Sequence, residues 1–383
     1  MCERQITAAA IALIGWACAC GRSPPPPEQG LTTDTPATTR VRVPNSRPLY
    51  VVGHLQRYEV GAAGLRGLEG RIRHVAEMGF TGVRLGLEWP RIEVSPGHRS
   101  WEHIDAIVEL LQANGLEAYG LLAFSPDWAR PQGTRRTHRP VLGGSVAAGD
   151  SAFASFSAAA ANRYAGVIDT WEIWNEPNIE QFWSHLSDGT DTGPDPADYL
   201  RLFELARGAI LAANPDVVVM TGGLAAGPSE MAFRGRKLAG SRTGYPAALF
   251  LEGLLDLGLK PSAVGLHPYL PLAGWARAAP PDSLNPRLAE VLTVLDRYDL
   301  EGTDVYVTEW GIDEKLVGPG AVAPWFQAGL TVLSCSPRVR LLTIYALTDW
   351  GESNRYGLLD SSGVLTEAGG ELRRFRTEDT ECP

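Results

Sequence analysis

Cysteine is scarce in this 383-residue chain, which contains five. Cys2, Cys18 and Cys20 fall within the first 20 residues, so Cys335 and Cys382 are the two that remain in the rest of the chain. Neither has the neighbours of a metal-binding or catalytic cysteine, which argues against thiol chemistry. In an exported protein the two either form one disulfide or stay as separate thiols.

Positive charge is also in short supply. The 34 lysines and arginines are outnumbered by 44 aspartates and glutamates, and the formal net charge is −10. This balance argues against a surface that binds polyanions, so nucleic acid is not an expected partner. The sequence also lacks a metal-ligand cluster, a phosphate-binding glycine loop and a nucleophile elbow, so we expect neither a metal nor a cofactor.

The apolar run near the N-terminus is too short to cross a membrane. Ile6–Ala19 comprises 14 residues, whereas a membrane-spanning helix needs about 20. That length suits the core of a signal peptide, so residues 1–20 predict export to the periplasm, the outer surface or the medium. The sequence ACACG at 17–21 combines an A-x-A cleavage site with a lipobox-like pattern, in which Cys20 would be lipidated and would tether the protein to a membrane.

A change of composition marks the domain boundary. Residues 21–46 are rich in proline, threonine and small polar residues, and the four prolines at 24–27 favour extended polyproline structure. We interpret this segment as a disordered linker. No second linker follows, so residues 47–383 are expected to form one domain.

This domain alternates between short runs rich in β-branched and aromatic residues and longer stretches rich in alanine and leucine. The first texture is typical of buried strands and the second of amphipathic helices. The predicted strands are 49–55, 81–87, 116–124, 167–175, 216–223, 263–269, 304–310 and 339–347. The helices are expected to begin near Ala63, Trp101, Asp150, Asp195, Tyr245, Asn285, Ala323 and Thr366. Eight strand–helix units predict an α/β fold of the (β/α)8 TIM-barrel type, although a doubly wound open sheet uses the same alternation.

The sequence WEIWNEPN, residues 171–178, ends the fourth predicted strand. Pro177 cannot continue a strand ladder, so Glu176 is expected at the barrel rim, where substrate arrives. Alternation predicts that Glu172, Trp174 and Glu176 share one face while Asn175 points off it. Glu172 lies two residues deeper, where a buried acid is expected to pair with an internal arginine.

A second glutamate, Glu309, ends the seventh predicted strand within VYVTEWGID, residues 305–313. A closed barrel would bring Glu176 and Glu309 to the same cleft. Two carboxylates across a cleft suit the cleavage of glycosidic bonds, in which one acid protonates the leaving oxygen and the other attacks the anomeric carbon. Nearby tryptophans would stack on sugar rings. A salt-bridged surface acid is the alternative for either glutamate taken alone.

These motifs make the chain resemble the clan A glycoside hydrolases, (β/α)8 enzymes with an acid/base at the end of strand four and a nucleophile at the end of strand seven. The resemblance runs from about Pro48 to Arg373. It implies that Glu176 is the acid/base, that Asn175 binds the sugar 2-hydroxyl, and that Glu309 is the nucleophile of a retaining mechanism. Within the clan, WEIWNEPN with the following FW, and AANPDVVVMTGGLA, are most similar to family 39.

The resemblance implies further residues along the rim. Arg84 would hydrogen-bond the nucleophile and keep it ionised, and Tyr269 would contact the same carboxylate. The other expected substrate contacts are His267, Trp128, Trp183, Trp310 and Trp350. Structural roles are the alternatives: a salt-bridged arginine, a core histidine, or a loop tryptophan that covers the rim.

The expected partner is therefore an oligo- or polysaccharide, bound by a monomer. Two other functions remain open from the residues: a transglycosylase of the same fold, and a non-catalytic glycan-binding barrel. The basic run GTRRTHRP, with Arg135, Arg136 and Arg139, either attracts an anionic glycan or is a solvated loop.

Overall fold

The computed structural model describes residues 47–57, 62–184, 186–187, 190–191, 193–226, 244–269, 286–318, 320–349, 355–378 and 382. These residues belong to one compact unit, Arg40–Pro383. The predicted signal peptide (1–20), the linker (21–46), Cys20 and Trp350 lie outside the described residues. No helix within the described residues is long and apolar enough to cross a membrane.

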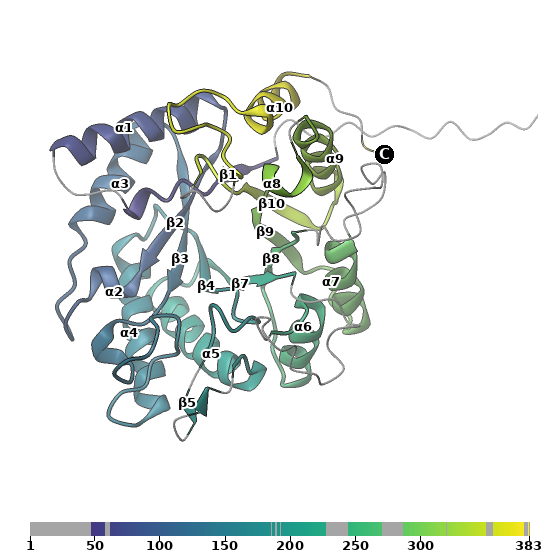
Figure 1. Cartoon of the computed structure of the whole chain (residues 1–383). Coiled ribbons are helices and arrows are strands. Elements are labelled where there is room, and N and C mark those ends of the chain that lie inside the picture. Colours follow the sequence, from purple (N-terminus) through teal and green to yellow (C-terminus); the bar gives the residue numbers. More distant parts are fainter. Residues whose placement is uncertain are drawn as a thin grey trace, which may run out of the picture. The chain divides into compact units, whose positions relative to one another are not determined.

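Parallel strands close into a barrel at the centre of the fold (Figure 1). Around the barrel the strand order is β1-β10-β9-β8-β7-β4-β3-β2. Because β1 pairs with both β10 and β2, the sheet has no open edge, which excludes the doubly wound alternative. The strands are β1 (Leu49–Val51), β2 (Gly82–Glu88), β3 (Glu117–Ala123), β4 (Thr170–Asn175), β7 (Val218–Ala225), β8 (Ala263–His267), β9 (Asp304–Trp310) and β10 (Val339–Ile344). Each overlaps a strand predicted from the sequence.

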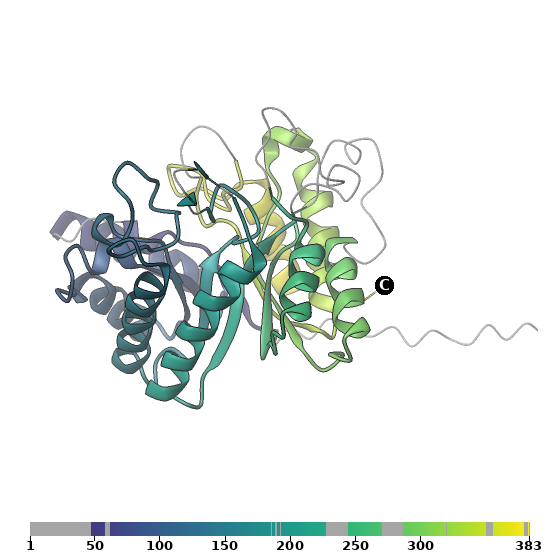
Figure 2. The same cartoon turned by 90° about the horizontal axis from the view of Figure 1, so that it is seen from below.

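Helices lie along the outside of the strands (Figure 2). The long ones are α1 (Ala62–Glu77), α3 (Glu102–Ala113), α4 (Val146–Arg163), α5 (Pro196–Ala213), α6 (Ala247–Asp256), α7 (Pro286–Arg297), α9 (Val322–Cys335) and α10 (Glu367–Thr377). Except for α4, they begin within two residues of the expected positions. Asp195 caps α5 by accepting from the backbone N–H groups of Ala197 and Asp198. Helix α4 begins four residues earlier than expected because Ser145 caps it, accepting from Ala148 N.

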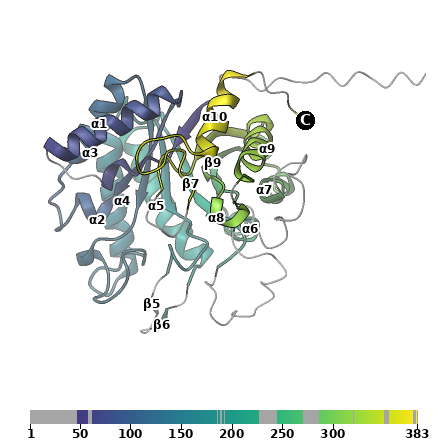
Figure 3. The same ribbon diagram turned by 45° about the horizontal axis from the view of Figure 1, so that its top comes forward.

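Short helices and strands lie in the loops between the barrel strands and the long helices. They are α2 (Trp89–Ile92), α8 (Glu314–Val317), the 3-10 turns η1 (Leu55–Arg57) and η2 (Asp127–Ala129), and the strands β5 (Leu186–Ser187) and β6 (Thr190–Asp191). The antiparallel β5–β6 pair projects away from the barrel (Figure 3). A disulfide joins Cys335, at the end of α9, to Cys382 near the C-terminus.

The barrel interior is polar at the level of the predicted site. Val83, Leu85 and Leu87 of β2 are buried, and Arg84 between them lies on the opposite face of the strand. Glu172 of β4 is fully buried and contacts groups on β2, β7 and β9, so it lies inside the barrel. The deep acid therefore pairs with an internal arginine, as the sequence predicts.

The end of β4 departs from regular alternation. Trp174 has a left-handed backbone (φ 72°), and its ring packs against Phe153 of α4 and against Trp183, with centroid separations of 5.6 and 5.1 Å. Asn175 turns inward instead, where its Oδ1 accepts from Arg84 Nη2 at 2.9 Å. The prediction that Trp174 shares a face with Glu172 and Glu176, and that Asn175 points off it, is wrong, because the left-handed residue reverses the alternation.

Candidate active site

Glu176 lies immediately after β4, at the C-terminal end of the barrel. Its backbone is left-handed (φ 46°), and its N–H donates to Gly223 O of β7 at 3.1 Å. The turn that follows is fixed by Asn178, whose side chain donates to Ala225 O and Tyr245 O and accepts from Ala225 N, all within 2.9 Å. These bonds hold the turn, and the Glu176 carboxylate reaches His267 of β8.

Glu309 occupies the matching position near the end of β9. Its Oε1 accepts from Arg84 Nη1, and its Oε2 accepts from the Tyr269 hydroxyl at 3.2 Å. Both contacts agree with those implied by the family resemblance. Arg84 is 6% exposed, so its charge acts on the carboxylate with little screening by water.

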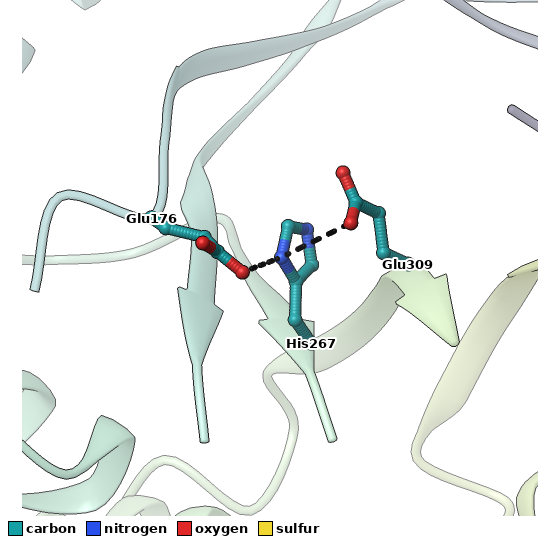
Figure 4. Close-up of side chains that lie close together, drawn as sticks. All are labelled: Glu176, His267 and Glu309. Atoms are coloured by element: carbon teal, nitrogen blue, oxygen red, sulfur yellow. Dashed lines mark hydrogen bonds and ion pairs between the residues drawn. The ribbon is translucent and has the colours of Figure 1, made fainter. Parts of the chain in front are cut away.

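His267, the last residue of β8, lies between the two acids (Figure 4). Its Nδ1 is 2.8 Å from Glu176 Oε1 and 3.8 Å from Glu309 Oε2. One ligand atom from each of the three side chains lies within 4.8 Å of the others. The barrel therefore brings together two carboxylates that are 133 residues apart in the sequence.

Beneath this trio, Glu172 and Arg84 form a buried network. Arg84 donates to Glu172 through Nε (2.7 Å) and Nη2 (2.9 Å), and Glu172 also accepts from Gly223 N (2.7 Å) and Thr308 Oγ1 (3.0 Å). Each polar atom has a partner, as a buried ion pair requires. The fork of Arg84 thus spans Glu172, Glu309 and Asn175 and fixes all three.

The electrostatic balance favours the ionised form of Glu309. Burial alone would raise the pKa of its carboxyl, but His267, Arg84 and His54 lower it, as does the hydrogen bond from Tyr269. The net effect holds the pKa of Glu309 below its usual value. A carboxylate held ionised in this way, with Arg84, Tyr269 and His267 beside it, is suited to act as a nucleophile.

Three tyrosines form one wall beside Glu309. Tyr269, Tyr345 and Tyr356 pack edge to face, with ring centroids 5.4 to 6.5 Å apart. Burial and the nearby acids raise the pKa of all three, that of Tyr356 to about 12, so the hydroxyls stay protonated. His54, which follows β1, packs edge-on against Tyr345 at 5.6 Å.

A comparison with known families identifies the chain. The family model for cellulase (glycosyl hydrolase family 5) matches residues 56–325. The chain belongs to glycosyl hydrolase family 5. Family 5 is part of clan A, so the predicted clan is confirmed. The match includes Glu176, His267 and Glu309, whereas the predicted export signal and linker lie outside it.

Solved structures similar to this family 5 chain are also clan A barrels. A family 39 glycoside hydrolase from Bacteroides cellulosilyticus WH2 is 18% identical with a TM-score of 0.65, over 87% of this chain and 64% of that one. A monomeric β-xylosidase from Caulobacter crescentus CB15 is 17% identical with a TM-score of 0.61, over 89% and 70% of the two chains. A psychrophilic family 10 endo-β-1,4-xylanase is 17% identical with a TM-score of 0.57, over 86% and 96%. These identities establish the shared fold alone. No curated protein matches the chain.

The aromatic residues predicted to bind sugar divide into distinct groups in this family 5 barrel. Trp183 and Trp310 are 0% and 1% exposed. Trp183 is enclosed by Trp174 and Tyr199, and Trp310 packs against Phe326 of α9. Neither ring presents a surface to a ligand, so the prediction that they bind substrate is wrong. Trp310, the last residue of β9, packs toward α9, whereas Trp183, in the loop after β4, packs against Tyr199 of α5.

Trp128 is partly buried in the loop after β3. Its Nε1 donates to Glu93 O at 2.8 Å, and its ring packs edge-on against Trp89 at 5.2 Å. It therefore fastens two rim loops together, and its predicted contact with sugar stays a prediction. Trp350 lies outside the described residues.

Three residues beside the acid pair are not marked as functional by their sequence context. His54 follows a short strand, Thr308 precedes Glu309 in a β-branched run, and Gly223 sits in a glycine pair. A Cβ on Gly223 would lie 2.1 Å from His267 Nε2 and 2.4 Å from Thr308 Oγ1, so only glycine leaves room for the histidine. The glycine pair is visible in the sequence, but its purpose depends on a neighbouring strand.

The same trio is the one group of His, Cys, Asp and Glu in the described residues that could bind a metal ion. Glu309 is already engaged by Arg84 and Tyr269, and Glu176 by His267. This donor set, with a guanidinium against one carboxylate, fits an acid pair for proton and glycosyl transfer better than a cation site.

Proposed function

We propose that this family 5 protein is a retaining O-glycoside hydrolase that cleaves an oligo- or polysaccharide by double displacement. Glu309 is the nucleophile and Glu176 is the general acid/base. The observation that carries the proposal is the pair of carboxylates at the ends of β4 and β9, joined through His267.

In the first step, Glu309 attacks the anomeric carbon as the glycosidic C–O bond breaks, and a covalent glycosyl-enzyme forms. Protonated Glu176 gives its proton to the departing oxygen. The lowered pKa of Glu309 supports this division of roles, because the nucleophile must be ionised before attack. Asn175, held by Arg84, is in position to bind the 2-hydroxyl of the sugar.

In the second step, the ionised Glu176 removes a proton from water, which attacks the anomeric carbon and releases Glu309. Two inversions give net retention. The separation of the acids supports retention: one oxygen of each lies within 4.8 Å of the other, whereas carboxyl groups are about 5 to 5.5 Å apart in retaining enzymes and about 6.5 to 9.5 Å apart in inverting ones.

Aryl glycosides with leaving groups of different acidity test the two roles. Glu309→Gln is expected to lower kcat/KM by about ten-thousandfold or more on every substrate, since no nucleophile remains. Glu176→Ala is expected to lower kcat/KM little for a dinitrophenyl leaving group, but about a hundredfold or more for an alkyl one that needs protonation. Unchanged activity of Glu309→Gln would overturn the assignment.

Trapping provides an independent check. The 2-fluoro analogue of the best aryl glycoside should label one peptide, and that peptide should contain Glu309. A label on a different peptide contradicts the proposal. A non-catalytic glycan-binding barrel would show binding of the glycan with no turnover of any glycoside.

The sugar is proposed only as a class. The similar structures are named as a β-xylosidase and a xylanase, so xylosides and glucosides are the first substrates to test. This chain covers 64% of the family 39 structure from Bacteroides cellulosilyticus WH2, so nothing further of that protein's function is carried over. Product analysis with and without an acceptor sugar separates hydrolysis from transglycosylation.

We also propose that the protein is exported, acts as a monomer, and is tethered to a membrane through lipidated Cys20. The disulfide between Cys335 and Cys382 supports export, because such bonds persist in oxidising compartments. Detergent partitioning of wild type against Cys20→Ala tests the tether, and size-exclusion chromatography tests the monomer. Recovery of both forms in the aqueous phase would contradict lipidation.

A further inference from the structure

Three arginines from three rim segments converge on a single buried carboxylate, that of Glu88 at the end of β2. Arg136 Nη1 donates to Glu88 Oε2 at 2.9 Å, Arg91 Nε donates to the same oxygen at 3.1 Å, and Arg57 Nε lies 3.7 Å from Oε1. The Glu88 side chain is 3% exposed. Burial alone would raise the pKa of Glu88, but the three guanidiniums outweigh it and lower the pKa. We call these three residues the arginine cluster.

The arginine cluster has more positive charge than Glu88 can neutralise. Arg136 and Arg91 both donate to the same oxygen of Glu88, so two positive charges share one negative charge there. This surplus is local, since the whole chain has a formal net charge of −10. Arg136 and Arg91 are 42% and 51% exposed, so both reach solvent. A guanidinium has five N–H donors, and in the described part of the chain each of these two gives one to Glu88.

Arg136 is held in place independently of Glu88. Its guanidinium lies over the ring of Phe124, 4.9 Å from the centroid, and its carbonyl accepts from Ser125 N at 2.8 Å. Phe124 follows β3 directly, so the arginine is anchored to the strand end. A guanidinium fixed this way loses little entropy when it binds a ligand.

The arginine cluster belongs to the same rim as the acid pair. His54 lies close enough to Glu309 and to Glu88 for both charges to act on its imidazole. Tyr345 is likewise influenced by Glu309 and by Arg57. Because Arg57 follows β1, Arg91 follows β2 and Arg136 follows β3, the cluster lies on the β1–β3 part of the barrel rim that also carries Glu309.

We propose that the arginine cluster binds an anionic substituent, a carboxylate or a sulfate ester, on the sugar next to the one that is cleaved. The substrate of this protein is therefore an acidic glycan rather than a neutral one. The inference rests on the proposed hydrolase function and specifies the substrate class of that site. Arginine forks pair with planar oxyanions through two parallel hydrogen bonds, which suits this recognition.

The test compares acidic polysaccharides with their own neutralised forms. Glucuronoxylan, alginate, polygalacturonate and chondroitin sulfate are each assayed before and after carboxyl reduction or desulfation. We expect the best substrate to be acidic, and its kcat/KM to fall about tenfold or more when the charge is removed, as expected for a charged hydrogen bond. Which treatment causes the loss identifies carboxylate or sulfate.

Two variants then assign the preference to the arginine cluster. Arg136→Gln and Arg91→Gln are expected to lower the ratio of kcat/KM on the acidic polymer to that on its neutralised form by about tenfold. Arg297→Gln is the matched control. It removes an exposed, ion-paired arginine from the last residue of α7, at the barrel end opposite the rim, and should keep the ratio.

The results of these assays distinguish the proposed hydrolase function from the inference about acidic glycans. If neutral glycans are cleaved as well as acidic ones, and cleavage depends on Glu309, the hydrolase function stands and the inference about acidic glycans is wrong. It is also wrong if Arg136→Gln lowers both rates equally while its melting temperature is unchanged, because the arginine then only organises the rim. If no glycan is cleaved, both proposals fail.

Discussion

Arg84 donates to two glutamates that have different roles in the protein. Glu172 lies within β4 and Glu309 near the end of β9, and the same guanidinium contacts both. Glu172 also accepts hydrogen bonds from Gly223 N and Thr308 Oγ1, so its partners lie inside the barrel. Glu309 instead meets the Tyr269 hydroxyl and His267 and stays at the cleft. Partner geometry, not residue type, separates the structural acid from the reactive one.

The Tyr269 hydroxyl is expected to tune Glu309. Tyr269→Phe keeps the ring in the tyrosine wall but removes the donor 3.2 Å from Glu309 Oε2. Activity is lost as pH falls through the pKa of Glu309, and losing a donor raises that pKa, so the acidic limb of kcat/KM should move to higher pH.

We expect kcat/KM to fall about tenfold as well, since a hydrogen bond to a charged group is lost. Tyr356→Phe is the matched control, because its hydroxyl has no hydrogen bond to Glu309 among the described residues. A pH profile of Tyr269→Phe that overlays the wild type would show that this hydrogen bond does not act on Glu309.

His54 is expected to make the fold sensitive to acid. Burial, with help from Arg57, lowers the pKa of His54 from 6.5 to about 4, so the native state holds it neutral. As the pH falls from about 6.5 to about 4, His54 binds a proton in the unfolded chain but not in the native state. The free energy of unfolding therefore decreases over this range. The loss is at most about 3 kcal/mol and is complete below about pH 4.

His54→Gln should therefore lose less stability than wild type over this pH range in chemical denaturation. His98→Gln, which replaces a solvent-exposed histidine, should behave like wild type. Equal acid sensitivity of wild type and His54→Gln would assign the effect to other groups.

At the scale of elements, neighbouring barrel strands pack so closely that some positions leave no space for a side chain. Gly223 of β7 is the narrowest such place, since a Cβ there would lie 2.1 Å from His267 Nε2 on β8. Gly223→Ala must displace His267 or separate the strands. We expect a loss of about a hundredfold in kcat/KM, as for misplacement by about an ångström, and a cost of about 1 to 3 kcal/mol in stability.

Gly70→Ala supplies the control for this change. Gly70 is inside α1 with nothing within 4 Å of its added Cβ, so the substitution should stabilise the protein by about 0.5 to 1 kcal/mol without changing turnover. Wild-type kinetics in Gly223→Ala would contradict the tight fit between β7 and β8.

The sequence predicts elements better than it predicts the directions of side chains. The strands follow from β-branched runs, and the start of α5 follows from Asp195, because these signals are local. The positions of Glu176 and Glu309 at strand ends follow from the same runs. The reversal at Trp174 does not, since a non-glycine residue with positive φ has no mark in the pattern. Nor does the fit of Gly223 to His267, which depends on a contact between two strands.

At the scale of the whole molecule, the disulfide fastens the C-terminal end of the chain to the barrel. Cys335 ends α9 and therefore lies at the barrel end opposite the acid pair. The bond closes a loop across 47 positions, which a chain-entropy estimate values at about 4 kcal/mol.

The double variant Cys335→Ser and Cys382→Ser should melt several degrees below wild type and keep its activity at moderate temperature. Reductant should lower the melting temperature of wild type and leave that of the double variant unchanged. A reductant effect on both proteins would point to another cause.

The burial of the tryptophans has a practical consequence for spectroscopy. Of the eleven in the chain, Trp89, Trp171, Trp174, Trp183 and Trp310 are all less than 2% exposed. Indoles in such apolar surroundings emit at short wavelengths, and a sugar in the cleft cannot touch these five rings. Intrinsic fluorescence should therefore report unfolding through a shift to longer wavelengths, whereas any change on adding a glycan must come from the other tryptophans, which include Trp128 and Trp350.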